Sequence, residues 1–356
     1  MGYLIELRNI VKSFGDNVVL NDFNLAINEN EFITLLGPSG CGKTTTLRIL
    51  GGFEKPDSGK VFFQGEDITD VPPNKRQINT VFQKYALFPH MDVGENIAFG
   101  LKISGRSDAY IRDKIKYALD LVNLSGFENR KVTSLSGGQQ QRIAMARAIV
   151  NEPKVLLLDE PLGALDLKLR QEMEYELIRL KNELGITFLY VTHDQEEALT
   201  MSDKVLVMNE GIIQQMGTPE EIYNEPQNAF VADFIGDSTI FDAVMVHDKL
   251  VSIGGVPFEC VDTGFGQNVP VDVVIRPEDV IIGKPGTGTV DGVVTHNVFI
   301  GVYYEMEIES GGLTWLAQNT TNYPVGTNVS LSVDPFNIQI MHKPESEDEE
   351  ALDLDV

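Results

Sequence analysis

The sequence predicts an α/β protein that is followed by a smaller all-β domain. Short, mainly apolar segments such as Val155–Leu158 and Ile186–Val191 alternate with longer amphipathic stretches, and apolar residues recur on one helical face from Leu165 to Leu184. This alternation is typical of a parallel sheet covered by helices. Beyond residue 236, short apolar runs are instead separated by Gly, Pro, Asn and Asp, which predicts a small barrel or sandwich of strands.

The composition excludes several classes of protein. The chain has 356 residues, of which 53 are acidic and 28 are basic, so its formal net charge is −25. This length suggests two domains, and the acidic excess argues against nucleic acid and anionic lipid as partners, since both attract a basic face. Two cysteines cannot build a disulfide framework, and the chain contains neither a signal-peptide pattern nor an apolar run long enough for a membrane span. We therefore expect a soluble cytoplasmic protein.

The acidic excess is concentrated in the last third of the chain. Residues 1–236 carry 33 acidic and 24 basic side chains, whereas residues 237–356 carry 20 acidic and 4 basic ones. This shift predicts a domain boundary near residue 236 and an all-β domain at 237–344. The segment 345–356 contains seven acids and no Lys or Arg, so we expect a disordered tail. Its acidity either aids solubility or binds a cationic ligand.

A phosphate-binding loop follows the first strand of the α/β part. Residues 31–37 are typical of a strand that enters a Gly-rich loop, and residues 43–50 of the helix after it. Glycine lets backbone N–H groups surround phosphates, and the helix start adds its positive dipole. The loop matches the P-loop pattern, in which Lys43 reaches the β/γ-phosphates and Thr44 ligates Mg²⁺. The predicted nucleotide-binding residues here are Gly37, Pro38, Ser39, Gly40, Cys41, Gly42, Lys43, Thr44 and Thr45.

Two carboxylates follow the apolar segment at 155–158. The carboxyl ends of parallel strands form the ligand crevice of an α/β sheet, so Asp159 and Glu160 lie where a P-loop needs partners. We predict that Asp159 binds Mg²⁺, directly or through water, and that Glu160 is the general base toward the attacking water. The alternative is an acidic pair that only caps the next segment.

A second helix start also has the character of an anion site. Ser136, Gly137, Gly138 and Gln139 precede a stretch of good helix formers, so their backbone N–H groups are expected at a helix N-terminus. The chain thus has two phosphate-binding helix starts but a single P-loop. Either it binds two ligands, or the second helix start serves the nucleotide of another copy.

These motifs together resemble the nucleotide-binding subunit of ABC transporters. Residues 135–139, Leu-Ser-Gly-Gly-Gln, match the family's signature motif, and the resemblance covers residues 3–236 as a P-loop ABC ATPase cassette, with a helical subdomain at about 88–150. In this family two cassettes sandwich two ATP molecules head to tail. The resemblance implies that the chain works with a second copy of itself, and that ATP and Mg²⁺ are its cofactors.

Four further positions match the family residue by residue. Gln83 matches the glutamine that touches Mg²⁺ and relays to the membrane subunit, and His193 matches the histidine that contacts the γ-phosphate. Asp166, after Leu165, matches the loop at the dimer interface. Phe14 matches the aromatic residue that stacks on adenine, where the family more often has Tyr, although stacking needs only a ring face. The resemblance thus implies catalytic roles for Glu160, His193 and Gln83.

The all-β region extends the resemblance to importers. Residues 275–279 and the strands from Gly292 onward are similar to the OB-like C-terminal domain of importer ATPases, and residues 85–91, 165–170 and 192–202 are most similar to importers of the polyamines spermidine and putrescine. The implied function is to energise polyamine import by ATP hydrolysis. An importer of sugars or other solutes is one alternative. A non-transport ABC ATPase in DNA repair or translation is another, but such proteins usually carry a coiled-coil insertion or two cassettes.

The resemblance also implies partners and a location. An importer ATPase binds two membrane permease subunits and is served indirectly by an extracytoplasmic solute-binding protein, and no nucleic acid takes part. We therefore expect this chain at the cytoplasmic face of the cell membrane, held there peripherally by the permease subunits.

Overall fold

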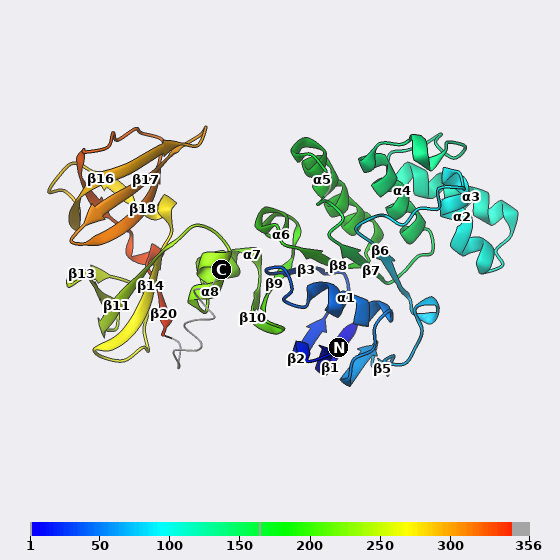
Figure 1. The fold of residues 1–356 in the computed structure, drawn as a ribbon, viewed down its shortest axis with the longest axis horizontal. Helices are drawn as coiled ribbons and strands as arrows, with labels where there is room; N and C mark the ends of the chain where they lie inside the picture. Colours follow the sequence, from blue (N-terminus) through cyan, green and yellow to red (C-terminus); the bar gives the residue numbers. More distant parts are fainter. Residues whose placement is uncertain (1, 164, 344–356) are drawn as a thin grey trace. The chain divides into compact units, whose positions relative to one another are not determined.

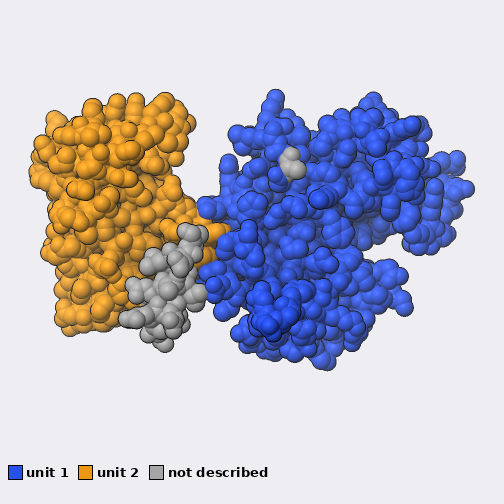
Figure 2. Space-filling model, viewed as in Figure 1, with its two compact units in different colours: residues 1–219 blue, residues 220–356 orange. Residues whose placement is uncertain are grey.

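The computed structural model describes residues 2–163 and 165–343 (Figure 1). The chain divides into two compact units, residues 1–219 and 220–356 (Figure 2). The acidic tail predicted at 345–356 lies outside the described residues. The second unit begins earlier than the charge-based boundary near residue 236, because it includes the short helix α8 (Ala229–Phe234) and nearly all of α7 (Pro219–Asn224).

The central sheet of the first unit has six strands in the order β10-β9-β3-β8-β7-β6. All neighbours are parallel except β10 and β9. Every residue of β3 (Phe32–Leu36) and β8 (Thr187–Thr192) is buried, as expected of strands covered on both faces. The other strands are β6 (Ile78–Val81), β7 (Val155–Asp159), β9 (Lys204–Asn209) and β10 (Ile212–Gly217). The predicted parallel α/β sheet is confirmed.

Two apolar cores lie on opposite faces of this sheet, because successive side chains of a strand point to opposite sides. Leu157 packs with α1 (Lys43–Gly51) and with an antiparallel sheet of order β2-β1-β4-β5. Its neighbour Leu158 packs instead with Leu177 and Leu180 of α5 (Leu167–Leu184). The antiparallel sheet consists of β1 (Ile5–Phe14), β2 (Asn17–Ile27), β4 (Ser58–Phe63) and β5 (Glu66–Asp67).

Helices occupy the segment that was expected to be a helical subdomain. They are α2 (Val93–Ile103), α3 (Asp108–Leu121) and α4 (Gly137–Ile149), and α6 (Gln195–Met201) follows β8 later in the chain. Asp92 and Ser107 begin α2 and α3 as side-chain N-caps, which satisfy amides that have no partner within the helix. Among the described residues, no helix is long and apolar enough to span a membrane.

The second unit is built mainly from two five-stranded antiparallel sheets around one core. Their orders are β13-β12-β11-β14-β20 and β15-β19-β16-β17-β18. Trp315 from the second sheet packs on Phe241 and Phe258 of the first, with ring centroids 4.6 and 5.8 Å apart. The strands are β11 (Thr239–His247), β12 (Leu250–Ile253), β13 (Val256–Glu259), β14 (Val269–Ile275), β15 (Ile281–Gly283), β16 (Val290–Phe299), β17 (Tyr304–Ser310), β18 (Leu313–Asn319), β19 (Asn328–Ser332) and β20 (Gln339–His342). The all-β prediction is confirmed.

Arg276 explains why the helices before residue 236 belong to the second unit. Its buried guanidinium follows β14 and donates hydrogen bonds to the carbonyl oxygens of Ala232 at 2.8 Å, Gly236 at 2.9 Å and Tyr223 at 3.1 Å. It also lies over the Tyr223 ring, 4.3 Å from the centroid. One side chain thus joins the segment 223–236 to the end of β14. The charge composition of the sequence does not reveal this contact.

Replacing Arg276 should therefore destabilise the second unit. In Arg276→Ala the three carbonyl groups lose a buried charged donor, so we expect the free energy of unfolding to fall by about 2–4 kcal/mol. Trp315 is the sole tryptophan of the sequence and is buried in this unit, so its fluorescence during urea unfolding reports the change. Lys284→Ala, at an exposed position of the same unit, is the control and should leave the midpoint unchanged.

Candidate active site

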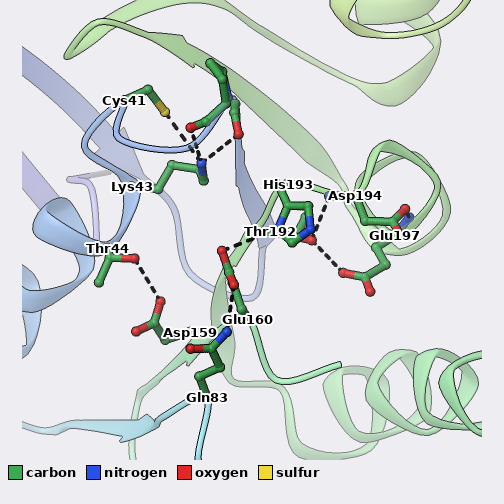
Figure 3. Close-up of polar contacts among 12 residues, drawn as sticks. Cys41, Lys43, Thr44, Gln83, Asp159, Glu160, Thr192, His193, Asp194 and Glu197 are labelled. Carbon is green, nitrogen blue, oxygen red and sulfur yellow. Dashed lines mark hydrogen bonds and ion pairs between the residues drawn. The ribbon is translucent and has the colours of Figure 1, made fainter. Parts of the chain in front are cut away.

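The P-loop connects β3 to α1 and has no side-chain cap at the helix start. Gly40 and Gly42 have φ values of +87° and +102°, a left-handed conformation that other residues rarely adopt. The buried ammonium of Lys43 donates to the carbonyl oxygens of Gly37 at 2.6 Å and Pro38 at 2.7 Å, and it lies 3.6 Å from the sulfur of Cys41 (Figure 3). The loop thus presents uncapped helix amides and a fixed cation, which suits a phosphate.

Asp159 and Thr44 supply two oxygen atoms at the edge of this loop. The Thr44 hydroxyl donates to Oδ1 of Asp159 at 3.1 Å, although the two residues are 115 positions apart in the sequence. Burial raises the pKa of Asp159, and the neighbouring charge of Glu160 raises it further. Among the described residues, no group of three or more His, Cys, Asp and Glu side chains could hold a metal ion by itself. Any metal here must therefore take further ligands from elsewhere.

Three predicted catalytic residues meet at the Glu160 carboxylate. The Gln83 amide nitrogen donates to Oε2 at 2.9 Å, and Nδ1 of His193 lies 3.5 Å from Oε1 (Figure 3). The backbone of Glu160 has φ +43° and its amide donates to the carbonyl oxygen of Val191 in β8 at 3.0 Å. Such a conformation costs free energy in a non-glycine residue and is kept where the surroundings impose it. It turns the carboxylate between Gln83 and His193.

The signature residues form a different site, at the start of α4. Ser136 and Gln139 bond to each other as a capping box: the Gln139 amide donates to the Ser136 hydroxyl at 3.4 Å, and the Ser136 amide donates to the Gln139 side chain at 3.1 Å. A Cβ added to Gly138 would lie 2.7 Å from a methyl group of Leu169 in α5, so a larger residue here would require Leu169 to move. Gly137 adjoins it, 3.9 Å from Leu165 by the same measure. The predicted second helix start is therefore present.

Asp166 and Phe14 lie outside the contacts around Glu160. Asp166 begins α5 as its N-cap, because its carboxylate accepts from the Leu169 amide at 3.0 Å. Phe14 is half exposed at the end of β1, and the Lys12 ammonium lies 5.0 Å from its ring centroid. Its exposed ring could stack on an adenine, which stays a prediction.

The sequence reasoning did not identify a polar network beside His193. The Thr192 hydroxyl donates to the buried Glu197 at 2.7 Å (Figure 3). Tyr190 also donates to Glu197 at 2.7 Å, and Arg170 of α5 donates to Asp194 at 2.6 Å. Four of these residues lie within 190–197, so their proximity to the histidine is visible in the sequence. Arg170 lies in a different helix, and its link to Asp194 depends on tertiary packing.

Comparison with known proteins identifies the family. A family model described as ABC transporter matches residues 20–163, and a TOBE domain model matches residues 273–341. The chain is 62% identical over 344 residues to the spermidine/putrescine import ATP-binding protein PotA of Acetivibrio thermocellus, covering 97% of this chain and 98% of that protein. The chain belongs to this family of ABC transporter ATPases. Its PotA relative in Clostridioides difficile is 61% identical over 340 residues, with 96% and 98% coverage.

Solved structures agree with this family. The protein cbiO1 of Clostridium perfringens, part of the ABC transporter complex cbiONQ, is 30% identical with a TM-score of 0.59, covering 62% of this chain and 91% of that one. The cassette MJ0796, solved as a dimer bound to ADP and Pi, is 32% identical with a TM-score of 0.54, covering 60% and 98%. The predictions of an ATP-binding ABC ATPase and an OB-like second domain are confirmed.

Removing the fixed cation of the P-loop should weaken nucleotide binding. In Lys43→Ala we expect the Kd for ATP to rise about 10- to 100-fold, because a charged hydrogen-bond donor to phosphate is lost. Titration calorimetry of the full chain measures this directly. Lys55→Ala removes an exposed, ion-paired lysine and is the matched control. An unchanged Kd in Lys43→Ala would contradict the assignment of the P-loop.

Proposed function

We propose that this chain is the ATP-hydrolysing subunit that energises import of spermidine and putrescine through a separate membrane permease. The observation that carries the proposal is full-length identity: eight relatives named for spermidine/putrescine import are 53–62% identical over 96–98% of this chain. These matches include the second unit as well as the cassette. Similarity confined to the cassette would not separate one importer from another, because ATP chemistry is shared by all of them.

The P-loop and Phe14 bind ATP in this proposal. The ring of Phe14 stacks on adenine, and the amides of residues 37–45 surround the phosphates. Lys43 exchanges its bonds to the Gly37 and Pro38 carbonyls for bonds to the β/γ-phosphates, which are stronger acceptors because they carry negative charge. The uncapped start of α1 supports this role.

Thr44, Asp159 and Gln83 fit a magnesium site. Mg²⁺ takes oxygen ligands and is usually held by one or two carboxylates together with phosphate oxygens. The Thr44 hydroxyl and the Asp159 carboxylate meet here at 3.1 Å. Burial and the charge of Glu160 raise the pKa of Asp159, so a bound cation would stabilise the ionised carboxylate. When bound, the ion neutralises charge on the transferring phosphoryl group.

Glu160 acts as the general base toward the attacking water. Gln83 donates to one carboxylate oxygen and so orients the other, which faces His193. His193 contributes a hydrogen-bonding ring nitrogen that contacts the γ-phosphate and stabilises the charge developing on it. These contacts hold the Glu160 carboxylate in one orientation, and they leave the His193 side chain 62% exposed.

A second copy of the chain completes each ATP site in this proposal. The dimeric, ADP- and Pi-bound state of the cassette MJ0796 supports an arrangement in pairs. The α4 start at Ser136–Gln139 of one copy then caps the γ-phosphate bound by the other, and Asp166 lies at the contact between copies. Hydrolysis reopens the pair. The pair binds two permease subunits at the cytoplasmic face of the membrane and is served indirectly by an extracytoplasmic solute-binding protein, without nucleic acid.

Substituting the general base should separate binding from turnover. In Glu160→Gln we expect ATP to bind as before, while kcat falls by about 10²–10⁴-fold, which is the usual contribution of a general base. Phosphate release by the full chain measures kcat, and calorimetry measures binding. Glu172→Gln changes an exposed glutamate of α5 and is the control. Turnover near the wild-type rate in Glu160→Gln would reject this role.

Uptake by cells tests the transported solute. In cells that lack this chain, we expect uptake of radiolabelled spermidine and putrescine to fall to background and uptake of maltose to remain. Expression of the wild-type chain should restore polyamine uptake, and Glu160→Gln should not. Loss of maltose uptake with intact polyamine uptake would instead identify a sugar importer.

A further inference from the structure

We propose that Arg170 and Glu197 are positioning residues, which hold the turn that carries His193 and link it to the start of α5. The inference rests on the catalytic role of His193 in the proposed function. It concerns the hydrogen bonds within residues 190–197 and the two contacts by which Arg170 joins this turn to α5.

His193 requires positioning from its backbone. Its side chain is 62% exposed, and its closest polar contact is the 3.5 Å approach to Glu160. Because few side-chain contacts hold the ring, its orientation depends on the backbone conformation of the residues before and after it. A displacement of about 1 Å in a reacting group is enough to lower the rate substantially.

Both neighbours of His193 are fixed by hydrogen bonds. The Thr192 hydroxyl donates to Glu197 at 2.7 Å and accepts from the Asp194 amide at 3.0 Å, so it bridges the two sides of the histidine. One oxygen of Asp194 accepts from the amides of Glu196 at 3.0 Å and Glu197 at 3.3 Å and so begins α6. The turn between β8 and α6 is therefore closed by its own side chains (Figure 3).

Glu197 is the anchor of this turn. Its side chain is 4% exposed and accepts a second bond, from the Tyr190 hydroxyl at 2.7 Å. Burial raises the pKa of Glu197, while the two hydroxyl donors act in the opposite direction. Burying a carboxylate among apolar residues costs free energy unless it is well bonded. Here the donors Tyr190 and Thr192 both come from the strand that leads into the histidine, so the bonds fix the end of β8.

Arg170 connects this anchored turn to α5. Its guanidinium donates to the free oxygen of Asp194 at 2.6 Å, and Nε lies 3.8 Å from the Glu197 carboxylate. The Arg170 amide donates to the Asp166 carbonyl at 2.9 Å within the first turn of the helix. Asp166, which faces the partner copy in the proposed function, is thereby joined to the neighbours of His193 through one side chain. Arg170 can transmit movement of the α5 start to the catalytic histidine.

The contribution of Arg170 to folding is expected to be small. Its side chain is 27% exposed, and ion pairs at partly exposed positions usually contribute little to stability. Its replacement should leave a folded cassette, so a loss of turnover can be assigned to the histidine.

A double-mutant cycle on the full chain tests the proposal. The variants are Arg170→Gln, His193→Ala and the double variant, with kcat and KM for ATP measured for each. We expect Arg170→Gln to lower kcat about tenfold with little change in KM, and to have no further effect in the His193→Ala background. Arg170→Lys keeps the charge and should restore part of the rate. A role in stability alone would not produce this loss of additivity.

Matched controls and alternative outcomes make the test decisive. Arg179→Gln removes another ion-paired arginine from α5, bonded to Glu176 and Glu183, and should leave kcat unchanged. Unchanged kcat in Arg170→Gln, or equal losses in both backgrounds, would overturn the proposal. If His193→Ala itself turns over normally, the role of His193 in the proposed function fails, and this inference fails with it. Glu197→Gln should repeat the non-additive loss, and far-UV circular dichroism verifies folding in every variant.

Discussion

The architecture of the candidate site depends on one constraint: parallel strands bring their carboxyl ends to the same edge of a sheet. The P-loop follows β3, Gln83 comes two residues after β6, Glu160 directly after β7 and His193 directly after β8. These side chains come from four strands, and the contacts that join Gln83 and His193 to Glu160 span 77 and 33 residues of sequence. A crossover connection carries the chain back to the other edge of the sheet before each parallel strand begins, so the loops that follow these strands all lie at the edge that holds the site.

Loops at such an edge are exposed, so the strand order alone does not fix a side chain. The loops that carry Glu160, His193 and Lys43 are each held by further hydrogen bonds. The Glu160 amide bonds to β8, and the Thr192 and Asp194 side chains close the turn around His193. Lys43 is bonded to the carbonyl groups of its own loop. The side chains of the site are thus held in place by hydrogen bonds to the ends of buried strands. This role accounts for buried polar groups such as Glu197.

Much of this arrangement could be predicted from the sequence, because its causes are local. Continuous burial makes strands such as β7 and β8 recognisable, glycine spacing marks the P-loop, and a carboxylate directly after a buried strand indicates Asp159 and Glu160. Contacts that depend on packing between distant elements were not predictable. Arg170 has no local signal, because its partner Asp194 is brought to it by the packing of α5 near β8. The extent of the second unit depends in the same way on Arg276, whose partners Gly236 and Tyr223 lie 40 and 53 positions earlier.

The two phosphate-binding elements share a physical property that bears on coupling between copies. Lys43 is satisfied by carbonyl groups of its own loop, and the start of α4 is satisfied by a capping box whose bonds are 3.1 and 3.4 Å long. The Lys43 ammonium and the capping-box groups of α4 already have partners, so in the proposed function the γ-phosphate replaces existing bonds at both elements. Replacement of neutral partners by an anion is favourable, because charge-assisted bonds are roughly twice as strong. The gain at α4 arises only when a second copy brings its nucleotide there. Closure of the pair is then driven by ATP itself, and loss of the γ-phosphate after hydrolysis restores the internal bonds of each element.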